Sequence, residues 1–162
     1  MNGFLLLFIA LAERGLSVAA FIFPFAELSS YFGAKVFLST DSITLRDFYM
    51  NYLGNFSNFY TNNNLLIFMF MIWLFLSCSR GSIPLTAFIR FNVIQAVLLN
   101  IICSCAGVIY TFLPVGLRES LLGVIFAKVL LLGTTILIIY SSLIILYGRV
   151  PEIPVLTDAA KL

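Results

Sequence analysis

The residues of this chain with the most chemical capability lie together at the start of its third long apolar stretch. Arg90, Asn92 and Gln95 interrupt a segment that is otherwise hydrophobic enough to enter a bilayer. Such side chains are expensive in lipid, so they indicate a polar partner, an aqueous path or a lipid headgroup within reach. Amide side chains offer hydrogen-bond donors and acceptors to any polypeptide backbone without selecting its sequence.

Helical spacing places the polar residues of this stretch on two faces. At about 100° per residue, Asn92, Gln95 and Cys103 fall within one stripe, and Arg90 falls on the opposite face. A stripe of polar and small side chains suits either contact between helices or the lining of a wet groove. Arg90, near the start of the helix, is either an anchor that reaches headgroups or a functional charge.

Three further features belong with these candidates. Lys128 lies inside the last apolar segment, where it either reaches the membrane surface along its stem or serves a functional role. Glu27 lies in the first apolar segment and is either protonated, at the interface or paired. Gly123 and Ala127 form a small-xxx-small pattern of the kind that packs helices closely. We interpret Arg90, Asn92, Gln95, Cys103, Lys128 and Glu27 as path-lining or partner-contact residues.

No arrangement of residues typical of catalysis is present in the sequence. Histidine is absent, no glycine-rich loop suits phosphate, and no paired carboxylates fall in a likely cleft. The three cysteines lack the spacing of a zinc site and suit small, packable membrane side chains. We therefore expect no enzyme activity, no catalytic residue, no cofactor and no metal.

The composition assigns the chain to the membrane class. Of its 162 residues, 62% are hydrophobic and only 10% are charged, and the mean hydropathy is +1.10. A soluble domain averages about 45–50% apolar and about 25% charged residues. The net charge of +2, without a basic run, does not suggest nucleic acid. Spanning segments must satisfy their own backbone, and no alternating pattern indicates a barrel, so we predict an all-α polytopic membrane protein.

The apolar segments predict four transmembrane helices in a single membrane domain, residues 1–162. The predicted spans cover about residues 15–31, 65–79, 86–112 and 119–147. A short N-terminal apolar helix over about residues 4–12 precedes them, separated by Glu13 and Arg14. It either lies in the membrane interface or merges with the first span into a long bent helix, and Pro24 is expected to kink that span.

The remaining segments are predicted to lie outside the bilayer. Residues 33–63, rich in asparagine and aromatic side chains, are interpreted as a polar interfacial loop with one short surface helix near 43–53. Residues 149–162 form a polar tail. An even number of spans places both termini on one side, and the excess of Arg and Lys on that side predicts that it is the cytoplasm-equivalent one.

Three stretches of the chain resemble the Tic twenty-kilodalton (Tic20) family. The run Phe88-Ile89-Arg90-Phe91-Asn92-Val93-Ile94-Gln95-Ala96-Val97-Leu98-Leu99, preceded by Arg80-Gly81, is similar to its signature. Phe21-Ile22-Phe23-Pro24-Phe25-Ala26-Glu27 with Tyr31-Phe32-Gly33 resembles the family's first span, and residues 148–160 resemble its C-terminal tail. The family's plan of four helices agrees with the plan read from hydropathy.

The resemblance implies a membrane core subunit of the protein-import translocon at the plastid (chloroplast) inner envelope, with its termini in the stroma. Such a subunit contributes to the preprotein-conducting path or anchors it. Implied partners are other translocon subunits, transiting preproteins and the lipid bilayer, without nucleic acid. Two other functions stay open: a structural membrane subunit without substrate contact, and a small-solute or ion channel.

Overall fold

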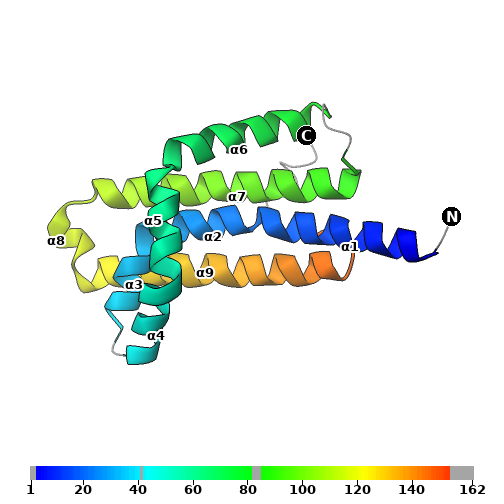
Figure 1. Cartoon of the computed structure of the whole chain (residues 1–162). Helices are drawn as coiled ribbons and strands as arrows, with labels where there is room; N and C mark the ends of the chain where they lie inside the picture. Colours follow the sequence, from blue (N-terminus) through cyan, green and yellow to red (C-terminus); the bar gives the residue numbers. More distant parts are fainter. Residues whose placement is uncertain (1–2, 41, 82–84, 154–162) are drawn as a thin grey trace.

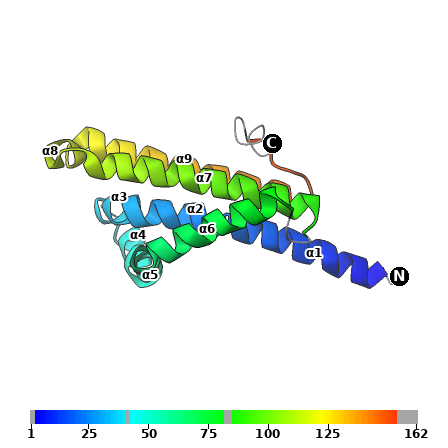
Figure 2. The ribbon, with the colours of Figure 1, turned by 90° about the horizontal axis from the view of Figure 1, so that it is seen from above.

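Helices make up nearly all of the described chain, which confirms the all-α fold class. The computed structural model describes residues 3–40, 42–81 and 85–153, and it contains no strand within these ranges. Four stretches of helix run along one common direction, with a shorter helical segment crossing them (Figure 1). Seen from above, the crossing segment lies to one side of the long helices (Figure 2).

The first long helical stretch runs from the N-terminal region to Leu38 with a single early break. It consists of α1 (Gly3–Ala20), α2 (Ile22–Leu28), the π-helical turn η1 (Ser29–Gly33) and α3 (Ala34–Leu38). The break falls at Phe21, because Pro24 has no N–H to donate to the carbonyl of Ala20. The N-terminal apolar helix is thus confirmed, and of its two predicted arrangements the structure has the merged one, since α1 continues through Glu13 and Arg14.

The third and fourth predicted spans appear as two long helices joined by a tight connection. They are α7 (Ala87–Phe112) and α9 (Leu121–Leu146), with the short helix α8 (Val115–Arg118) between them. Pro114 precedes α8, and the Ser120 hydroxyl caps α9 by accepting a hydrogen bond from the N–H of Gly123 at 3.3 Å. Both helices are long and apolar enough to cross a membrane, as is the helical stretch Phe8–Leu38.

The short surface helix predicted near residues 43–53 is present, but the rest of residues 33–63, predicted as a loop, is also mostly helical. After α3 the chain forms α4 (Ile43–Phe48), the π-helical turn η2 (Tyr49–Leu53) and α5 (Gly54–Asn62). These elements lie across the long helices (Figure 1). Tyr49, Ser57 and Tyr60 are buried, while most of their neighbours are exposed. The stretch is therefore amphipathic, and packing against the bundle holds as helix a sequence whose polarity suggested a loop.

The second predicted span forms α6 (Asn64–Ser79), which is joined to the crossing segment at an angle of 77°. With 16 residues α6 does not qualify alone as a membrane span, so the structure has three candidate spans in its described part, or four if the bent pair counts as one. α6 returns the chain to the end of the bundle from which α1 departs (Figure 1). The start of α1 and the end of α9 consequently lie at the same end.

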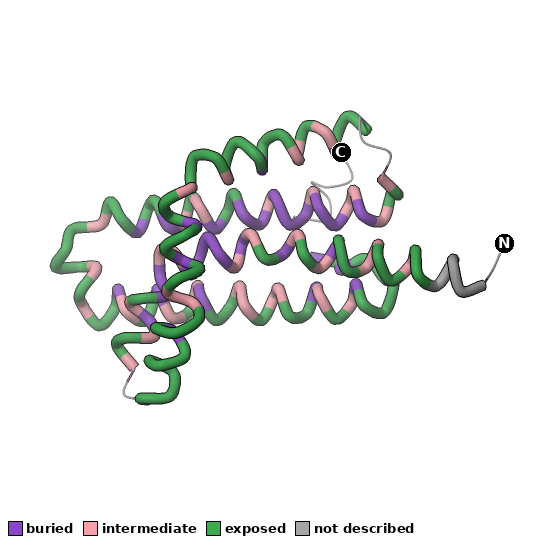
Figure 3. The backbone as a smooth tube through the Cα atoms, in the orientation of Figure 1, coloured by how far each residue is buried: buried purple, intermediate pink, exposed green. Residues whose placement is uncertain are grey.

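The core lies along α7, which packs between the first helical stretch and α6. In the most apolar window of α7, 50% of the residues are buried, against 17% in each of the other two candidate spans. Figure 3 shows the same contrast, with buried positions concentrated on α7 and on the adjoining part of α2. One buried cluster joins the first stretch, α7 and α9, and a second joins α6 to α7.

Candidate functional site: the polar core around α7

The amide side chains of α7 point into the protein. Asn92 and Gln95 are fully buried, and Asn100 is 4% exposed. None of these three amides is open to lipid or to a water-filled path in this conformation. The role predicted for Asn92 and Gln95 as path-lining or partner-contact residues stays a prediction, and any such role requires that the surrounding elements move.

A polar cluster joins three elements in the middle of the bundle. The Tyr60 side chain of α5 lies close to Glu27 of α2 and to Asn100 of α7. A tyrosine hydroxyl can donate its proton to a carboxylate and accept from an amide nitrogen. Glu27 is 2% exposed and forms no ion pair within the described residues, where Lys35 pairs with Glu119 instead. A buried carboxyl group in a membrane protein needs polar neighbours of this kind.

A second contact joins the first helical stretch to α7, further toward the C-terminal end of α7. The Tyr31 side chain of η1 lies near Ser104 of α7, and its ring lies against Gly107. A Cβ at Gly107 would collide with the Tyr31 ring, so glycine is required for this close approach. Nearby, the Ser57 hydroxyl of α5 donates to the carbonyl of Ser29 at 3.3 Å, which ties α5 to η1.

The remaining candidates on α7 and α9 pack inside the chain. Cys103 is buried and its thiol lies near Thr134 of α9. Ala127 is fully buried in the main core cluster. Gly123 faces the preceding turn, where a Cβ would lie 2.5 Å from the carbonyl oxygens of Leu117 and Arg118. Gly123 and Ala127 thus serve packing within the chain, and packing against another chain stays a prediction.

The end of α9 is tied to α1 and then to α7. The Arg14 guanidinium donates to the carbonyl of Leu146 at 2.8 Å, where a cation also meets the negative end of the helix dipole. Gly148, at φ +77°, ends the helix. The following segment reaches α7, where the amide nitrogen of Gln95 donates to the carbonyl of Pro151 at 3.2 Å. Pro151 and Ile153 are buried there.

The two basic candidates, Arg90 and Lys128, are both half-buried. The Arg90 guanidinium lies beside Gly81, where a Cβ would lie 3.0 Å from Nη1. Within the described residues the one ion pair joins Lys35 to Glu119 at 3.5 Å, so Lys128 has no carboxylate partner in this part of the chain.

The structure brings some of the predicted residues together and leaves others separate. Glu27 lies near Cys103, and Asn92 and Gln95 share one face of α7. Sequence reasoning missed Tyr60, Asn100 and Gly107. Asn100 carried a usable signal as an amide in a predicted span, whereas Tyr60 was one of many aromatic residues in a segment read as a loop. Among the described residues, no group of three metal-ligating side chains gathers.

The comparisons with known proteins agree with the resemblance drawn from the sequence. The sequence model described as "Chloroplast import apparatus Tic20-like" matches residues 12–160. The chain is 31% identical over 153 residues to the Tic20 family protein Ycf60 of Cyanidium caldarium, covering 94% of this chain and 74% of that protein. It is 29% identical over 157 residues to the protein of the same name from Gracilaria tenuistipitata var. liui, covering 95% and 76%.

No solved structure matches the chain. The family match spans nearly the whole sequence, including all three stretches that carried the resemblance. Together with the apolar helices and the buried polar core described above, it shows that this chain belongs to the Tic20-like family of the chloroplast import apparatus.

Proposed function

We propose that the chain is a membrane core subunit of the protein-import translocon at the plastid inner envelope. The observation that carries the proposal is the family match over residues 12–160, in a chain built of helices able to cross a membrane. A polytopic membrane protein of the import apparatus acts either on the preprotein path or on the assembly that surrounds it. The partners in this proposal are other translocon subunits, transiting preproteins and the bilayer.

The closed interior supports an anchoring role in the conformation described here. Asn92, Gln95 and Glu27 are buried against the chain's own helices, so a passing polypeptide does not reach them unless the bundle opens. Four helices also enclose too little space for a polypeptide. A path would therefore form between this chain and other subunits or copies, or after part of this chain moves aside. The burial of the α7 amides does not favour a small-solute channel either.

The orientation with both chain ends toward the stroma is part of the proposal. The start of α1 and the end of α9 lie at one end of the bundle (Figure 1). Arg14, Arg80, Arg90 and Arg149 lie toward that end, whereas Lys35, Arg46 and Arg118 lie toward the other. Positive charge accumulates on the cytoplasm-equivalent side of membrane proteins, which is the stroma for a plastid.

The test is import into plastids whose copy of this chain is depleted or replaced. A radiolabelled precursor with a stably folded passenger is arrested in the envelope, and adducts are collected from photoreactive residues placed along α6, α7 and α9. Adducts with the precursor support a role on the path, and adducts restricted to other translocon subunits support anchoring. Unchanged import after depletion, with neither kind of adduct, would contradict the proposal.

A further inference from the structure

The segment that follows α9, residues 149–153, is neither helix nor strand and packs on α7. The N–H of Gly148 donates to Ile145 at 2.8 Å and the N–H of Arg149 donates to Ile144 at 3.1 Å, which closes α9 in a Schellman arrangement. Beyond it, Pro151 is buried, Glu152 is exposed and Ile153 is buried. Successive side chains of an extended backbone point to opposite sides. This alternation therefore means that the segment lays one face on the bundle.

The face of α7 that contacts this segment binds a main-chain carbonyl and an apolar side chain, and any extended polypeptide can offer both. Gln95, fully buried, donates to the main-chain carbonyl of residue 151 at 3.2 Å. The side chain of Ile153 enters the main core cluster beside residues of the first stretch, α7 and α9. One main-chain hydrogen bond with alternate side chains in apolar surroundings is the way in which extended peptides are commonly bound.

The same helix also carries a buried amide, Asn92, whose hydrogen-bonding groups residues 149–153 leave unpaired. Asn92 stands three positions before Gln95, about 4.5 Å along the helix axis, and it is fully buried. Neither its amide oxygen nor its amide nitrogen has a hydrogen-bond partner in the described part of the chain. A buried amide without partners is costly. A longer extended segment that runs along α7 could pair its own backbone with both atoms.

We propose that this face of α7 is a binding site for an extended preprotein segment, and that residues 149–153 occupy it in the resting protein. The inference rests on the proposed function and names the part of the chain that a preprotein would contact. The occupying segment, defined here as the strap, leaves α7 when a preprotein enters. Gln95 then donates to a preprotein carbonyl in place of that of Pro151, and Asn92 gains the partners that it lacks.

The strap is suited to exchange rather than to permanent closure. Gly148, in a backbone conformation that favours glycine, separates it from α9. The Gln95 contact and the burial of Pro151 and Ile153 hold the strap, whereas Arg14 holds Leu146 of α9 itself. Because the strap is part of the same chain, it competes at an effective concentration of about millimolar, which only a polypeptide held at the site by a translocon would overcome.

The deciding experiment pins the strap in place within the full chain in plastid membranes. Cys78, Cys103 and Cys105 are replaced by alanine, and Gln95→Cys with Pro151→Cys is joined by a short bismaleimide. Because Gln95→Cys itself removes the proposed donor, the same variant without the reagent is the reference against which the effect of pinning is measured. A photoreactive residue at Leu98, which packs against the same core cluster as Ile153, reports contact with an arrested precursor. We expect the pinned strap to lower the precursor adduct at residue 98 about tenfold, equivalent to about 1.4 kcal/mol.

The control carries the same chemistry at a place that leaves the strap free. Arg14→Cys with Leu146→Cys, joined by the same reagent, pins α1 to the end of α9, and it should leave the adduct at residue 98 unchanged. An equal adduct in the strap-pinned and control proteins overturns the binding site while leaving the proposed function standing, provided that adducts form. If no residue of the unpinned chain forms a precursor adduct, a role on the path fails, and the binding site fails with it.

A second variant removes the strap by chemistry instead of pinning it. Ile153→Asp makes burial of residue 153 unfavourable, so the strap should leave α7. The precursor adduct at residue 98 should then rise about tenfold, equivalent to about 1.4 kcal/mol. Protease resistance of the helical core reports whether the fold persists. An unchanged or reduced adduct in a folded Ile153→Asp protein means that the strap is part of the structure and overturns the proposal.

Discussion

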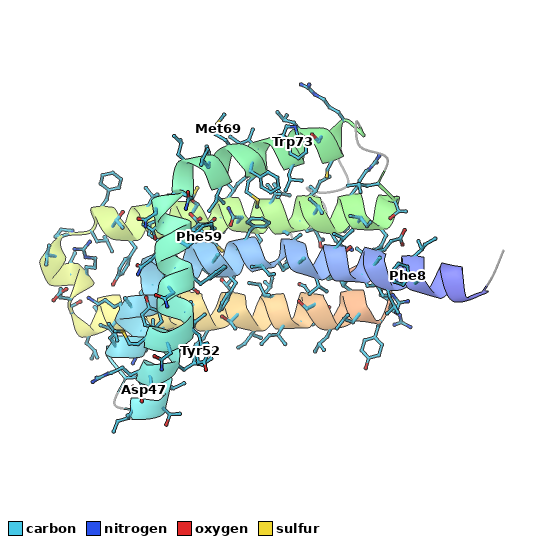
Figure 4. The ribbon with its side chains drawn as sticks, in the orientation of Figure 1. Phe8, Asp47, Tyr52, Phe59, Met69 and Trp73 are labelled. Atoms are coloured by element: carbon cyan, nitrogen blue, oxygen red, sulfur yellow. The ribbon has the colours of Figure 1, made fainter. Side chains whose placement is uncertain are left out.

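α6 and α7 lie side by side, and their sequences give opposite impressions of which one is buried. α6 is uniformly apolar, yet most of its large side chains are exposed, among them Met69 and Trp73, which point away from the bundle (Figure 4). α7 carries three amides, and all three are buried. In a membrane the lipid accepts apolar side chains as readily as a protein core does, so polar residues mark the helix that other helices surround.

The crossing segment shows the same rule in a different form. Asp47, Tyr52 and Phe59 lie on its open side (Figure 4), whereas Tyr60 turns inward to Glu27 and Asn100. Tyr60 and Ser57 thereby help to hold a segment of mixed polarity across the long helices. The polar core thus decides both which helix is central and where the amphipathic segment rests.

The largest effect is expected from crowding the centre of α7. Gly107→Leu forces a side chain into the Tyr31 ring and should lower the free energy of unfolding by about 3 kcal/mol. Gly133→Leu is the matched control, because a Cβ at Gly133 meets nothing within 4 Å. Thermal unfolding in nanodiscs measures both. Similar stability of the two variants would mean that α7 is not packed as described.

A smaller loss of stability is expected from substitutions on the inner face of α6, and almost none from substitutions on its outer face. Met71 is 3% exposed and packs in the cluster with α7, whereas Trp73 is 53% exposed. We expect Met71→Ala to cost about 2 kcal/mol through the cavity it leaves, and Trp73→Ala to change the free energy of unfolding little. The same nanodisc measurement applies. A larger loss from Trp73→Ala would indicate that the outer face of α6 is covered by protein.

The polar contacts that hold the crossing segment should be weaker still. In a double-mutant cycle with Tyr60→Phe and Asn100→Leu, we expect a coupling energy of about 0.6–1.7 kcal/mol, the range of hydrogen bonds between membrane helices. Hydrogen exchange of α5 should quicken in either single variant. Additive effects, with α5 protection unchanged, would show that the segment is held by packing alone.

The smallest effect is expected at the far end of the bundle. Lys35 and Glu119 pair at 3.5 Å, and the Glu119 side chain is 68% exposed. An exposed pair contributes at most about 1 kcal/mol and is screened by salt, so Lys35→Met should have a barely measurable effect on unfolding. A loss as large as that of Met71→Ala would show that this end is more tightly held than the structure implies.

Much of the fold could be predicted from hydropathy and from the positions of helix-breaking residues. The apolar runs placed α7 and α9, Pro24 predicted the break in the first stretch, and Gly148 marked the end of α9. These features are local, since each depends on residues within a turn or two. The stripe of Asn92, Gln95 and Cys103 was also local, and the structure buries all three on one side of α7.

The sequence by itself determined that the chain is a helical membrane protein, where its long helices run and which of them bears polar groups. Only the tertiary structure decided what those groups meet: Glu27 meets Tyr60, Tyr60 meets Asn100, and Gln95 meets Pro151. These partners are far apart in the chain, and no periodicity relates them. Their pairing follows from the need to satisfy each buried polar group within a low-dielectric interior, and that need is met by whichever helices the whole fold brings together.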